Sequence, residues 1–349
     1  MEKINKVIHV IWSLNQGGAE KILLDLEREN TTNYILVISR NNDFDSENKN
    51  IFYLKGNYFK KIQKILQFSK NTPVLFWMYK SICYGFPILF FRKCCGTIHH
   101  DLKYFSREKI STKISILLTL FLQKLSMCHL IYVSHASLKS HVEIGFSKSN
   151  SSVIPNGSPL IIPKNVNNLK IKQLLYVSRW DKIKNFDLAI EISKKLLEEN
   201  IIDRVVFVGK EVHQRNKDLL SIITDNNLNG KIKLEGFQSN LKKFYKSSSI
   251  TLISSYSESC PMALIESLSY GLPCFSTDVG DVKNIYNDNE DFIYKTATEA
   301  KEKISNYLNK TKSERDKISD TLINHHRNNY SLEAMKKKYL KLYENLFFS

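Results

Sequence analysis

The chain has 349 residues, 42% hydrophobic and 25% charged, which is enough for two ordinary domains and too apolar for a disordered protein. Its net charge of +16 favours anionic partners, namely nucleic acid, acidic lipid surfaces or phosphorylated small molecules. The six cysteines form no CxxC pair and no Cys/His spacing suited to zinc, so we expect free thiols in a reducing cytoplasm.

The first half alternates apolar runs with helical periodicity. The start, MEKINKVIHVIW, does not resemble a signal peptide. Apolar residues 73–91 are interrupted by Lys80, Gly85 and Pro87, which favours a buried strand and a short helix over a membrane span. Strands are predicted within 6–14, 34–39, 74–79, 95–100, 130–134 and 152–157, and helices within 15–29, 59–70, 106–128 and 137–145.

Residues 158–170 have two prolines, three asparagines and no clear period, which indicates a linker. Beyond it the alternation resumes. Strands are predicted at 173–178, 204–209, 231–236, 249–254 and 273–277, helices at 185–200 and 218–227, and an all-helical tail from about 298. We divide the chain into domains 1–165 and 166–325, followed by a C-terminal helix, 326–349, that can cross back to the first domain.

This alternation, without hairpin signals, predicts an α/β protein with two parallel, doubly wound sheets. Ligands of such sheets bind beyond the carboxyl ends of the strands, and the cleft between two sheets is the default site.

Two strand-to-helix loops have residues suited to phosphate. Gly17 and Gly18 in NQGGAE let the backbone approach a ligand at a helix N-terminus, although GxGxxG is absent and a tight turn explains them as well. Arg179 and Lys184 in VSRWDKIKNFDLA suit a diphosphate, and they also fit two solvated cations.

The stretch SYSESCPMALIESLSYGLPCFSTDVGD (255–281) places Glu258 in a loop and Glu266 in a helix. Pro261 fits the first turn of that helix, and Gly271 fits its C′ position. Carboxylates accept hydrogen bonds from ribose or hexose hydroxyls, and amides near 260–263 suit a phosphate. Alternatively, Glu266 is a buried acid paired with a structural cation and Glu258 is an exposed loop charge.

The stretch resembles the Glu-x7-Glu signature of retaining GT-B glycosyltransferases, the "glycosyl transferases group 1" or family 4 set. GGAE, VSRWDKIKNFDLAI, VFVG, LEGF and TDVGD are similar to the family's motifs and follow in its order. FWMY and GTIHHD resemble members that build bacterial surface polysaccharides, and VIPNG resembles the end of the N-terminal domain.

The resemblance implies a GT-B fold, with two Rossmann-like domains facing each other across a cleft. Domain 1–165 would bind the acceptor and domain 166–325 the nucleotide sugar. The implied reaction moves a hexose or related sugar from a UDP- or GDP-sugar to a hydroxyl of a lipid-linked glycan, with retention of configuration. It would serve O-antigen, capsule or lipopolysaccharide synthesis and need neither a metal nor a cofactor.

The resemblance also implies roles for individual residues. Arg179 and Lys184 would bind the donor diphosphate, Glu266 the ribose and Glu258 the donor sugar. A histidine of TIHHD, either His99 or His100, would face the sugar and the acceptor. Gly17, Gly18, Cys260, Pro261, Met262 and Ala263 would complete the donor site. The sequence departs from the family at Ser259-Cys260, where Gly-Phe is usual, and at Asp281, where a second glycine is frequent.

Two basic helices indicate where such an enzyme would work. Lys60, Lys61, Lys64 and Lys70 lie in 59–70, and Arg107, Lys109, Lys113 and Lys124 lie in 106–128. Such helices suit the anionic inner leaflet and peripheral attachment on the cytoplasmic side, although solvated faces over an ordinary core also explain them.

Rival functions remain. A nucleotide-sugar epimerase or a phosphorylase can use the same fold, and a non-catalytic binder of anionic polymers would explain the charge. The presence of Glu258 and Glu266 together with Arg179 and Lys184 favours a transferase. We therefore expect no nucleic acid partner. The sequence leaves the donor sugar, the acceptor and the oligomeric state open.

Overall fold

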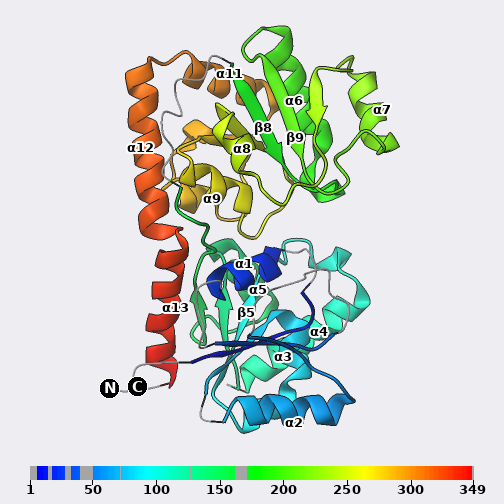
Figure 1. Ribbon diagram of the computed structural model, residues 1–349, viewed down its shortest axis with the longest axis vertical. Helices are drawn as coiled ribbons and strands as arrows, with labels where there is room; N and C mark the ends of the chain where they lie inside the picture. Colours follow the sequence, from blue (N-terminus) through cyan, green and yellow to red (C-terminus); the bar gives the residue numbers. More distant parts are fainter. Residues whose placement is uncertain are drawn as a thin grey trace. The chain divides into compact units, whose positions relative to one another are not determined.

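The computed structural model describes residues 6–14, 18–27, 33–39, 50–70, 72–125, 127–161 and 171–347. The chain divides into two compact units. Unit 1 comprises Met1–Gly157 and Leu332–Ser349, and unit 2 comprises Ser158–Ser331. Each unit is a parallel sheet with helices (Figure 1).

The sheet of unit 1 has seven parallel strands in the order β3-β2-β1-β4-β5-β6-β7. Its central strands are completely buried, as the apolar runs predict for a sheet covered on both faces. The strands are β1 (Ile8–Ile11), β2 (Tyr34–Val37), β3 (Ile51–Tyr53), β4 (Val74–Trp77), β5 (Cys94–Ile98), β6 (His129–Tyr132) and β7 (Ser151–Val153).

The helices of unit 1 include one from the far end of the chain. α13 (Leu332–Phe347) contacts α1 (Gly18–Glu27), and Nζ of Lys93 donates to the carbonyl of Phe347 at 2.7 Å. The others are α2 (Tyr58–Phe68), α3 (Met78–Tyr84), η1 (Phe86–Phe90), η2 (Phe105–Arg107), α4 (Ile110–Lys124) and α5 (His135–Ile144).

The sheet of unit 2 has six parallel strands in the order β10-β9-β8-β11-β12-β13. The strands are β8 (Gln173–Val177), β9 (Arg204–Val208), β10 (Ile232–Leu234), β11 (Ile250–Ile253), β12 (Cys274–Thr277) and β13 (Ile293–Tyr294). The helices are η4 (Lys182–Lys184), α6 (Phe186–Glu198), α7 (Lys217–Asp225), α8 (Lys242–Lys246), α9 (Met262–Ser269), α10 (Val282–Ile285), η5 (Glu290–Phe292), α11 (Ala297–Leu308) and α12 (Lys312–Asn329).

The predicted pair of parallel, doubly wound sheets is confirmed. Gly145 and Gly271, predicted to stop helices, both have positive φ just after α5 and α9. The continuous helix predicted at 106–128 is wrong, because η2 ends at Arg107 and α4 begins at Ile110. Glu108 and Lys109 are extended between them, and the Glu108 carboxylate pairs with His100.

Within the described residues, no helix is both long enough and apolar enough to cross a membrane. The apolar stretch 73–91 forms β4, α3 and η1, as predicted for a strand followed by a short helix.

Each sheet has one point at which the strand order reverses. In unit 1 it lies between β1 and β4, and in unit 2 between β8 and β11. Chains leave these adjacent strands to opposite faces, which opens a crevice where ligands of such folds bind. The chemistry-bearing side chains should therefore gather at the carboxyl ends of these four strands.

Candidate functional site

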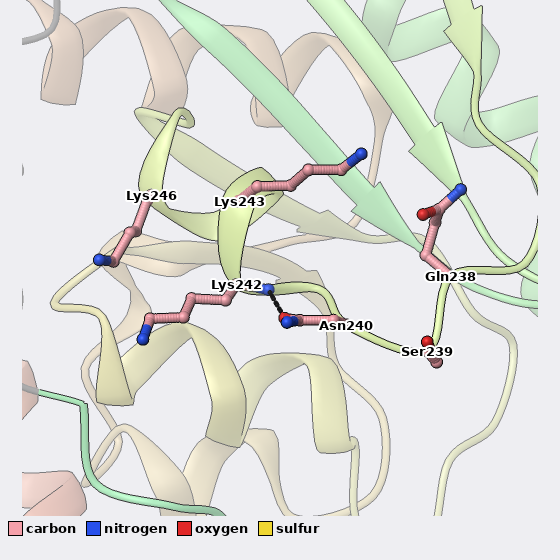
Figure 2. A pocket seen from close by; sticks show the side chains of 6 residues that line it. All are labelled: Gln238, Ser239, Asn240, Lys242, Lys243 and Lys246. Carbon is pink, nitrogen blue, oxygen red and sulfur yellow. Dashed lines mark hydrogen bonds between the residues drawn. The ribbon is translucent and has the colours of Figure 1, made fainter.

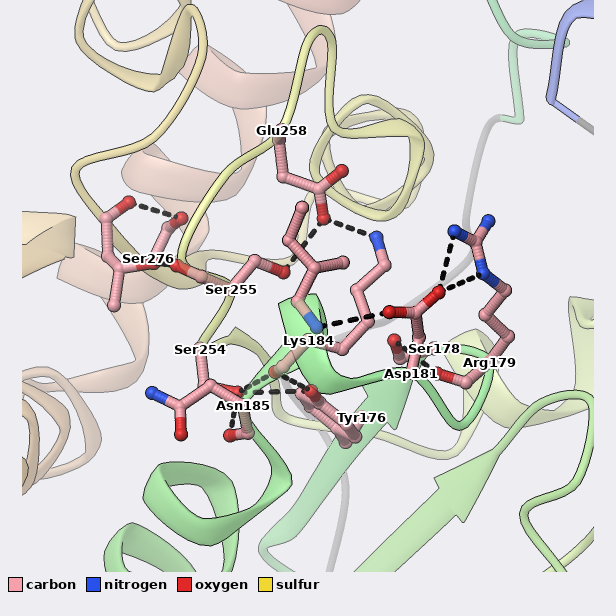
Figure 3. A network of polar contacts seen from close by, with 12 residues as sticks. Tyr176, Ser178, Arg179, Asp181, Lys184, Asn185, Ser254, Ser255, Glu258 and Ser276 are labelled. Carbon is pink, nitrogen blue, oxygen red and sulfur yellow. Dashed lines mark hydrogen bonds and ion pairs between the residues drawn. The ribbon is translucent and has the colours of Figure 1, made fainter. Parts of the chain in front are cut away.

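The loops that follow β8 and β11 are joined at the switch point of unit 2 (Figure 3). The hydroxyl of Ser254 donates to the carbonyls of Lys184 and Asn185, at 2.9 and 3.0 Å. The hydroxyl of Tyr176 donates to the same Lys184 carbonyl at 2.7 Å. These bonds fix the Lys184 backbone relative to both strands.

Lys184 and Glu258 form an ion pair across the two loops. Nζ of Lys184 lies 2.5 Å from Oε1 of Glu258, and each side chain is less than a fifth exposed. The hydroxyl of Ser255 donates to the same carboxylate oxygen at 2.8 Å. An ammonium has three donors, so Lys184 can hold Glu258 and also donate to a phosphate oxygen.

Asn185 makes the sharp corner that presents Lys184. Its backbone is left-handed, with φ 52° and ψ 61°, a conformation that asparagine tolerates better than most residues. It ends η4 and also caps α6, because its side chain accepts from the N–H of Leu188 at 3.4 Å.

Arg179 is the exposed cation of this site. Its Nε and Nη2 donate to Oδ2 of Asp181 at 3.1 and 3.0 Å, and its side chain is 62% exposed. Burial opposes ionisation of Asp181, but the N–H of Ile183, then Arg179 and Lys184, hold its pKa below the usual range. The carboxylate thus stays charged and orients the guanidinium, whose remaining donors suit phosphate.

Two glycines let neighbouring backbone approach the two loops. A Cβ on Gly209, just after β9, would lie 1.8 Å from the carbonyl oxygen of Ser178 and 3.0 Å from the nitrogen of Arg179. A Cβ on Gly280 would lie 2.6 Å from the carbonyl oxygen of Glu258. Any side chain at either position would therefore displace a loop that carries a candidate site residue.

Glu266 lies on α9, half-buried, and accepts a hydrogen bond from the hydroxyl of Tyr245 at 2.8 Å. The Tyr245 ring stacks on Tyr270, with centroids 4.9 Å apart. Burial, and then the charge of Glu266, raise the pKa of Tyr245 well above its usual range, so its hydroxyl remains a donor. The carboxylate is thereby oriented before any ligand arrives.

The N-terminus of α9 begins at Met262, directly after Pro261. No side chain caps it, and its first turn has no acidic residue. The partial positive charge of an uncapped helix start suits a phosphate. Cys260 and Pro261 are buried here, whereas Met262 and Ala263 are partly exposed.

A separate hollow of about 460 Å³ lies along the segment between β10 and α8 (Figure 2). Three of its side chains are cationic, but none of the residues predicted for donor binding lines it. Its lining residues are Gln238, Ser239, Asn240, Lys242, Lys243 and Lys246.

In unit 1, His99 follows β5 and stacks on Trp77, the last residue of β4, with centroids 5.1 Å apart. Its backbone N–H donates to Sδ of Met78 at 3.4 Å. Among the described residues neither ring nitrogen of His99 has a hydrogen-bond partner, and burial lowers its pKa to about 3. His99 is therefore an uncharged imidazole at neutral pH.

Trp77 is fixed by a buried chain of polar groups. Its indole N–H donates to Nδ1 of His9 at 3.1 Å, and Nε2 of His9 lies 3.1 Å from Oε1 of Glu27. An indole nitrogen only donates, so His9 has its proton on Nε2, facing Glu27. Asn33 donates to the other carboxylate oxygen at 2.9 Å. Met78, the residue that follows Trp77, has a φ of 68°, which is costly for any residue with a side chain.

The remaining predicted residues differ in their surroundings. Nε2 of His100 lies 2.9 Å from Oε1 of Glu108, so the neighbouring histidine is paired whereas His99 is not. Gly18 begins α1, and a Cβ there would meet nothing within 4 Å. Gly17 lies outside the described residues. Asp281, buried, precedes α10 as its N-cap residue.

Several residues of these clusters escaped the sequence analysis. Asp181 lies between Arg179 and Lys184 in the sequence, so its position could have indicated that it pairs with one of these cations. Tyr245 and His9 gave none, because each reaches its partner only through the fold. Within the described residues, no group of three or more His, Cys, Asp or Glu side chains is placed to hold a metal ion.

Residues 158–324 match the family model described as "Glycosyl transferases group 1". This part of the chain belongs to the group 1 glycosyltransferases. The match contains the residues predicted for donor binding in unit 2, among them Arg179, Lys184, Glu258 and Glu266.

Two bacterial glycosyltransferases are similar to the chain in sequence. CapH of Staphylococcus aureus, a capsular polysaccharide biosynthesis glycosyltransferase, is 26% identical over 303 residues, which cover 78% of this chain and 81% of CapH. The UDP-Gal:alpha-D-GlcNAc-diphosphoundecaprenol alpha-1,3-galactosyltransferase of Escherichia coli is 28% identical over 183 residues, 46% of this chain and 47% of that enzyme.

A solved structure extends the likeness to both units. The structure of HepE from Anabaena, in complex with UDP and glucose, has a TM-score of 0.78 at 16% identity. It covers 97% of this chain and 99% of its own. The fold is therefore GT-B, built from two Rossmann-like units, as the family resemblance implied.

Gly209→Ala should destabilise the protein more than Gly230→Ala does. Both glycines have positive φ, which costs a residue with a side chain about 1–2 kcal/mol. Only Gly209 also meets backbone, because a Cβ on Gly230 has nothing within 4 Å. Urea unfolding measures the difference, and equal midpoints for the two variants would show that the β9 end does not press on the Arg179 loop.

His99→Phe should make stability less sensitive to acid. The unfolded histidine takes up a proton near pH 6.5, but the folded one does so only near its pKa of about 3. Stability is therefore lost as the pH falls between these values, by about 1.4 kcal/mol per pH unit. Phenylalanine keeps the stack on Trp77 and removes this loss. Parallel curves of unfolding free energy against pH for wild type and variant would contradict the buried, neutral imidazole.

Proposed function

We propose that the chain transfers a hexose or related sugar from a UDP- or GDP-sugar to a hydroxyl of a lipid-linked glycan, with retention of configuration. The observation that carries the proposal is the ion pair between Lys184 and Glu258 at the switch point of unit 2, within the part of the chain that matches the group 1 family model. Arg179, oriented by Asp181, and Glu266, oriented by Tyr245, belong to the same matched part. The product would enter a bacterial surface polysaccharide such as capsule, O-antigen or lipopolysaccharide.

Breaking the bond between sugar and diphosphate leaves negative charge on a phosphate oxygen and positive character on the sugar ring. We propose that Lys184, Arg179 and the start of α9 stabilise the leaving phosphate. Hydrogen bonds already hold the backbone of Lys184 and the guanidinium of Arg179, so little reorganisation of these two cations would accompany the reaction. Glu258 would accept hydrogen bonds from the donor sugar while it holds Lys184 in place.

Glu266 would bind the ribose. A carboxylate can accept from two neighbouring hydroxyls, and Tyr245 holds this one in a fixed orientation. We further propose that His99 meets the sugar or the acceptor as a neutral imidazole, which can donate through one nitrogen and accept through the other.

The relatives support the choice of substrates. The Escherichia coli relative is named for a UDP-Gal donor and an alpha-D-GlcNAc-diphosphoundecaprenol acceptor. The structure of HepE contains UDP and glucose. A lipid-linked acceptor would place the reaction at the inner face of the cytoplasmic membrane, with the chain attached peripherally.

Purified chain incubated with UDP- and GDP-sugars and a polyprenyl-diphosphate-linked glycan tests the proposal. Transfer should extend the glycan by one sugar, and the anomeric coupling in the product should match that of the donor. Hydrolysis or epimerisation of the donor without extension of any acceptor would favour a different enzyme on this fold.

Lys184→Met should lower kcat by about 10²–10³, as loss of one fixed donor to a developing oxyanion does in other enzymes. Lys182→Met is the matched control, since it removes the same charge two residues away from an exposed side chain. Steady-state kinetics of both variants measure the effect. Equal losses would assign the effect to a lower positive charge in general and not to a donor that Lys184 holds at the leaving phosphate.

Glu266→Ala should remove discrimination between UDP and its 2′- and 3′-deoxy analogues. In the wild type each hydroxyl bonded to a carboxylate should contribute about 1.5–3 kcal/mol, a difference of roughly 10- to 150-fold in affinity. Glu258→Ala should retain the discrimination. Titration calorimetry with the three nucleotides measures these affinities for the wild type and both variants. Discrimination that survives in Glu266→Ala would show that the ribose binds elsewhere.

A further inference from the structure

α4 exposes an apolar stripe on the side that faces away from the core. Six large side chains share it, with exposed fractions between 40% and 77%. They recur at three- and four-residue spacing and cover about 100° of the helix circumference, at 3.6 residues per turn. The stripe consists of Ile110, Ile114, Leu117, Leu118, Phe121 and Leu125, the last just beyond the helix end.

The stripe is not the face that packs the helix. Ile116, Thr119, Leu122 and Gln123 are buried on the opposite side, and α4 lies beside α3 there, with Sγ of Cys83 donating to the carbonyl of Ser115 at 3.3 Å. Exposed apolar patches of this extent usually mark protein or membrane contacts.

The part of the sequence that contains the stripe is strongly basic. Residues 48–142 contain fifteen lysines and arginines but only two acidic residues, Asp101 and Glu108. This stretch thus holds a surplus of 13 of the chain's net +16. α4 itself has no acidic residue, and Lys113 and Lys124 flank the stripe on one side at helical spacing.

We propose that the α4 stripe is a membrane-docking surface that enters the headgroup region of an anionic bilayer. The charge complementarity selects this occupant over a protein partner, because anionic lipid satisfies many dispersed lysines at once, and Leu, Ile and Phe enter the acyl boundary. α4 has 15 residues, fewer than the roughly 20 needed to span a bilayer, so it would lie in the plane of the surface.

The purpose of this docking surface rests on the proposed function, because an acceptor held in the membrane requires an enzyme that works beside the membrane. It also separates two roles. The switch-point residues of unit 2 would perform the transfer, and α4 would determine how long the chain remains at the membrane.

Vesicle co-sedimentation tests the docking surface, with phosphatidylglycerol–phosphatidylethanolamine vesicles compared with phosphatidylcholine vesicles. The wild type should bind the anionic vesicles, and added salt should weaken that binding. Leu117→Glu should lower the binding about tenfold or more. Leu340→Glu on α13 is the matched control, with the same substitution in the same unit at 48% exposure against 50%, and should bind like the wild type.

Three outcomes would overturn the proposal. They are absence of wild-type binding, equal loss in both variants, and sedimentation analysis in which Leu117→Glu separates a dimer but leaves vesicle binding unchanged. The last would assign the stripe to a second copy of the chain.

Transfer to a short-chain, water-soluble acceptor separates this proposal from the proposed function. Leu117→Glu should retain wild-type turnover on that acceptor, and a comparable loss of turnover would contradict a role confined to docking. A wild type that binds anionic vesicles but transfers no sugar would refute the proposed function and leave the docking surface standing.

Discussion

The ion pair between Lys184 and Glu258 is the contact on which the candidate donor site depends. It joins the loops that follow two adjacent strands, β8 and β11, across the point where the strand order reverses. The pair is largely shielded from water, which strengthens its attraction but leaves a high cost if either partner is removed. Ser254 and Tyr176 fix the Lys184 backbone through uncharged hydrogen bonds, and Ser255 donates to the Glu258 carboxylate.

The switch point of unit 1 is built from different chemistry. The indole of Trp77 from β4 donates a hydrogen bond to His9 of β1, and His9 is paired with Glu27. An aromatic ring thus joins the two strands in unit 1, whereas a lysine joins the two loops in unit 2. The result is a flat, uncharged surface on which the His99 ring stacks. The switch point of unit 2 therefore has exposed and half-buried charged side chains, whereas that of unit 1 has stacked aromatic rings.

Much of this arrangement could be predicted from local sequence. The alternation of apolar runs and helical periods specified two parallel sheets, because each signal lies within one element. The break at Glu108 and Lys109 could not be predicted in this way, since it accompanies a pairing with His100 across a loop. The outward direction of the α4 stripe also escaped prediction, because α4 is apolar on opposite faces and periodicity alone does not say which one packs.

Residue type and spacing alone singled out Arg179, Lys184, Glu258 and Glu266 as candidates for the donor site, and their roles stay predictions. The site was not predictable where a partner comes from a distant element, as Tyr245 does for Glu266 and Gly209 for the Arg179 loop. In both cases the missing information is three-dimensional packing.

Nucleotide-induced stabilisation tests the central claim most directly. A single nucleoside diphosphate, present at 100 times its dissociation constant, should raise the unfolding free energy of the wild type by about 2.7 kcal/mol. The gain should disappear in Arg179→Ala and in Glu266→Ala, provided that both remain folded. If no nucleotide stabilises the folded wild type, the residues at the switch point of unit 2 do not form a donor site, and the transferase account is wrong.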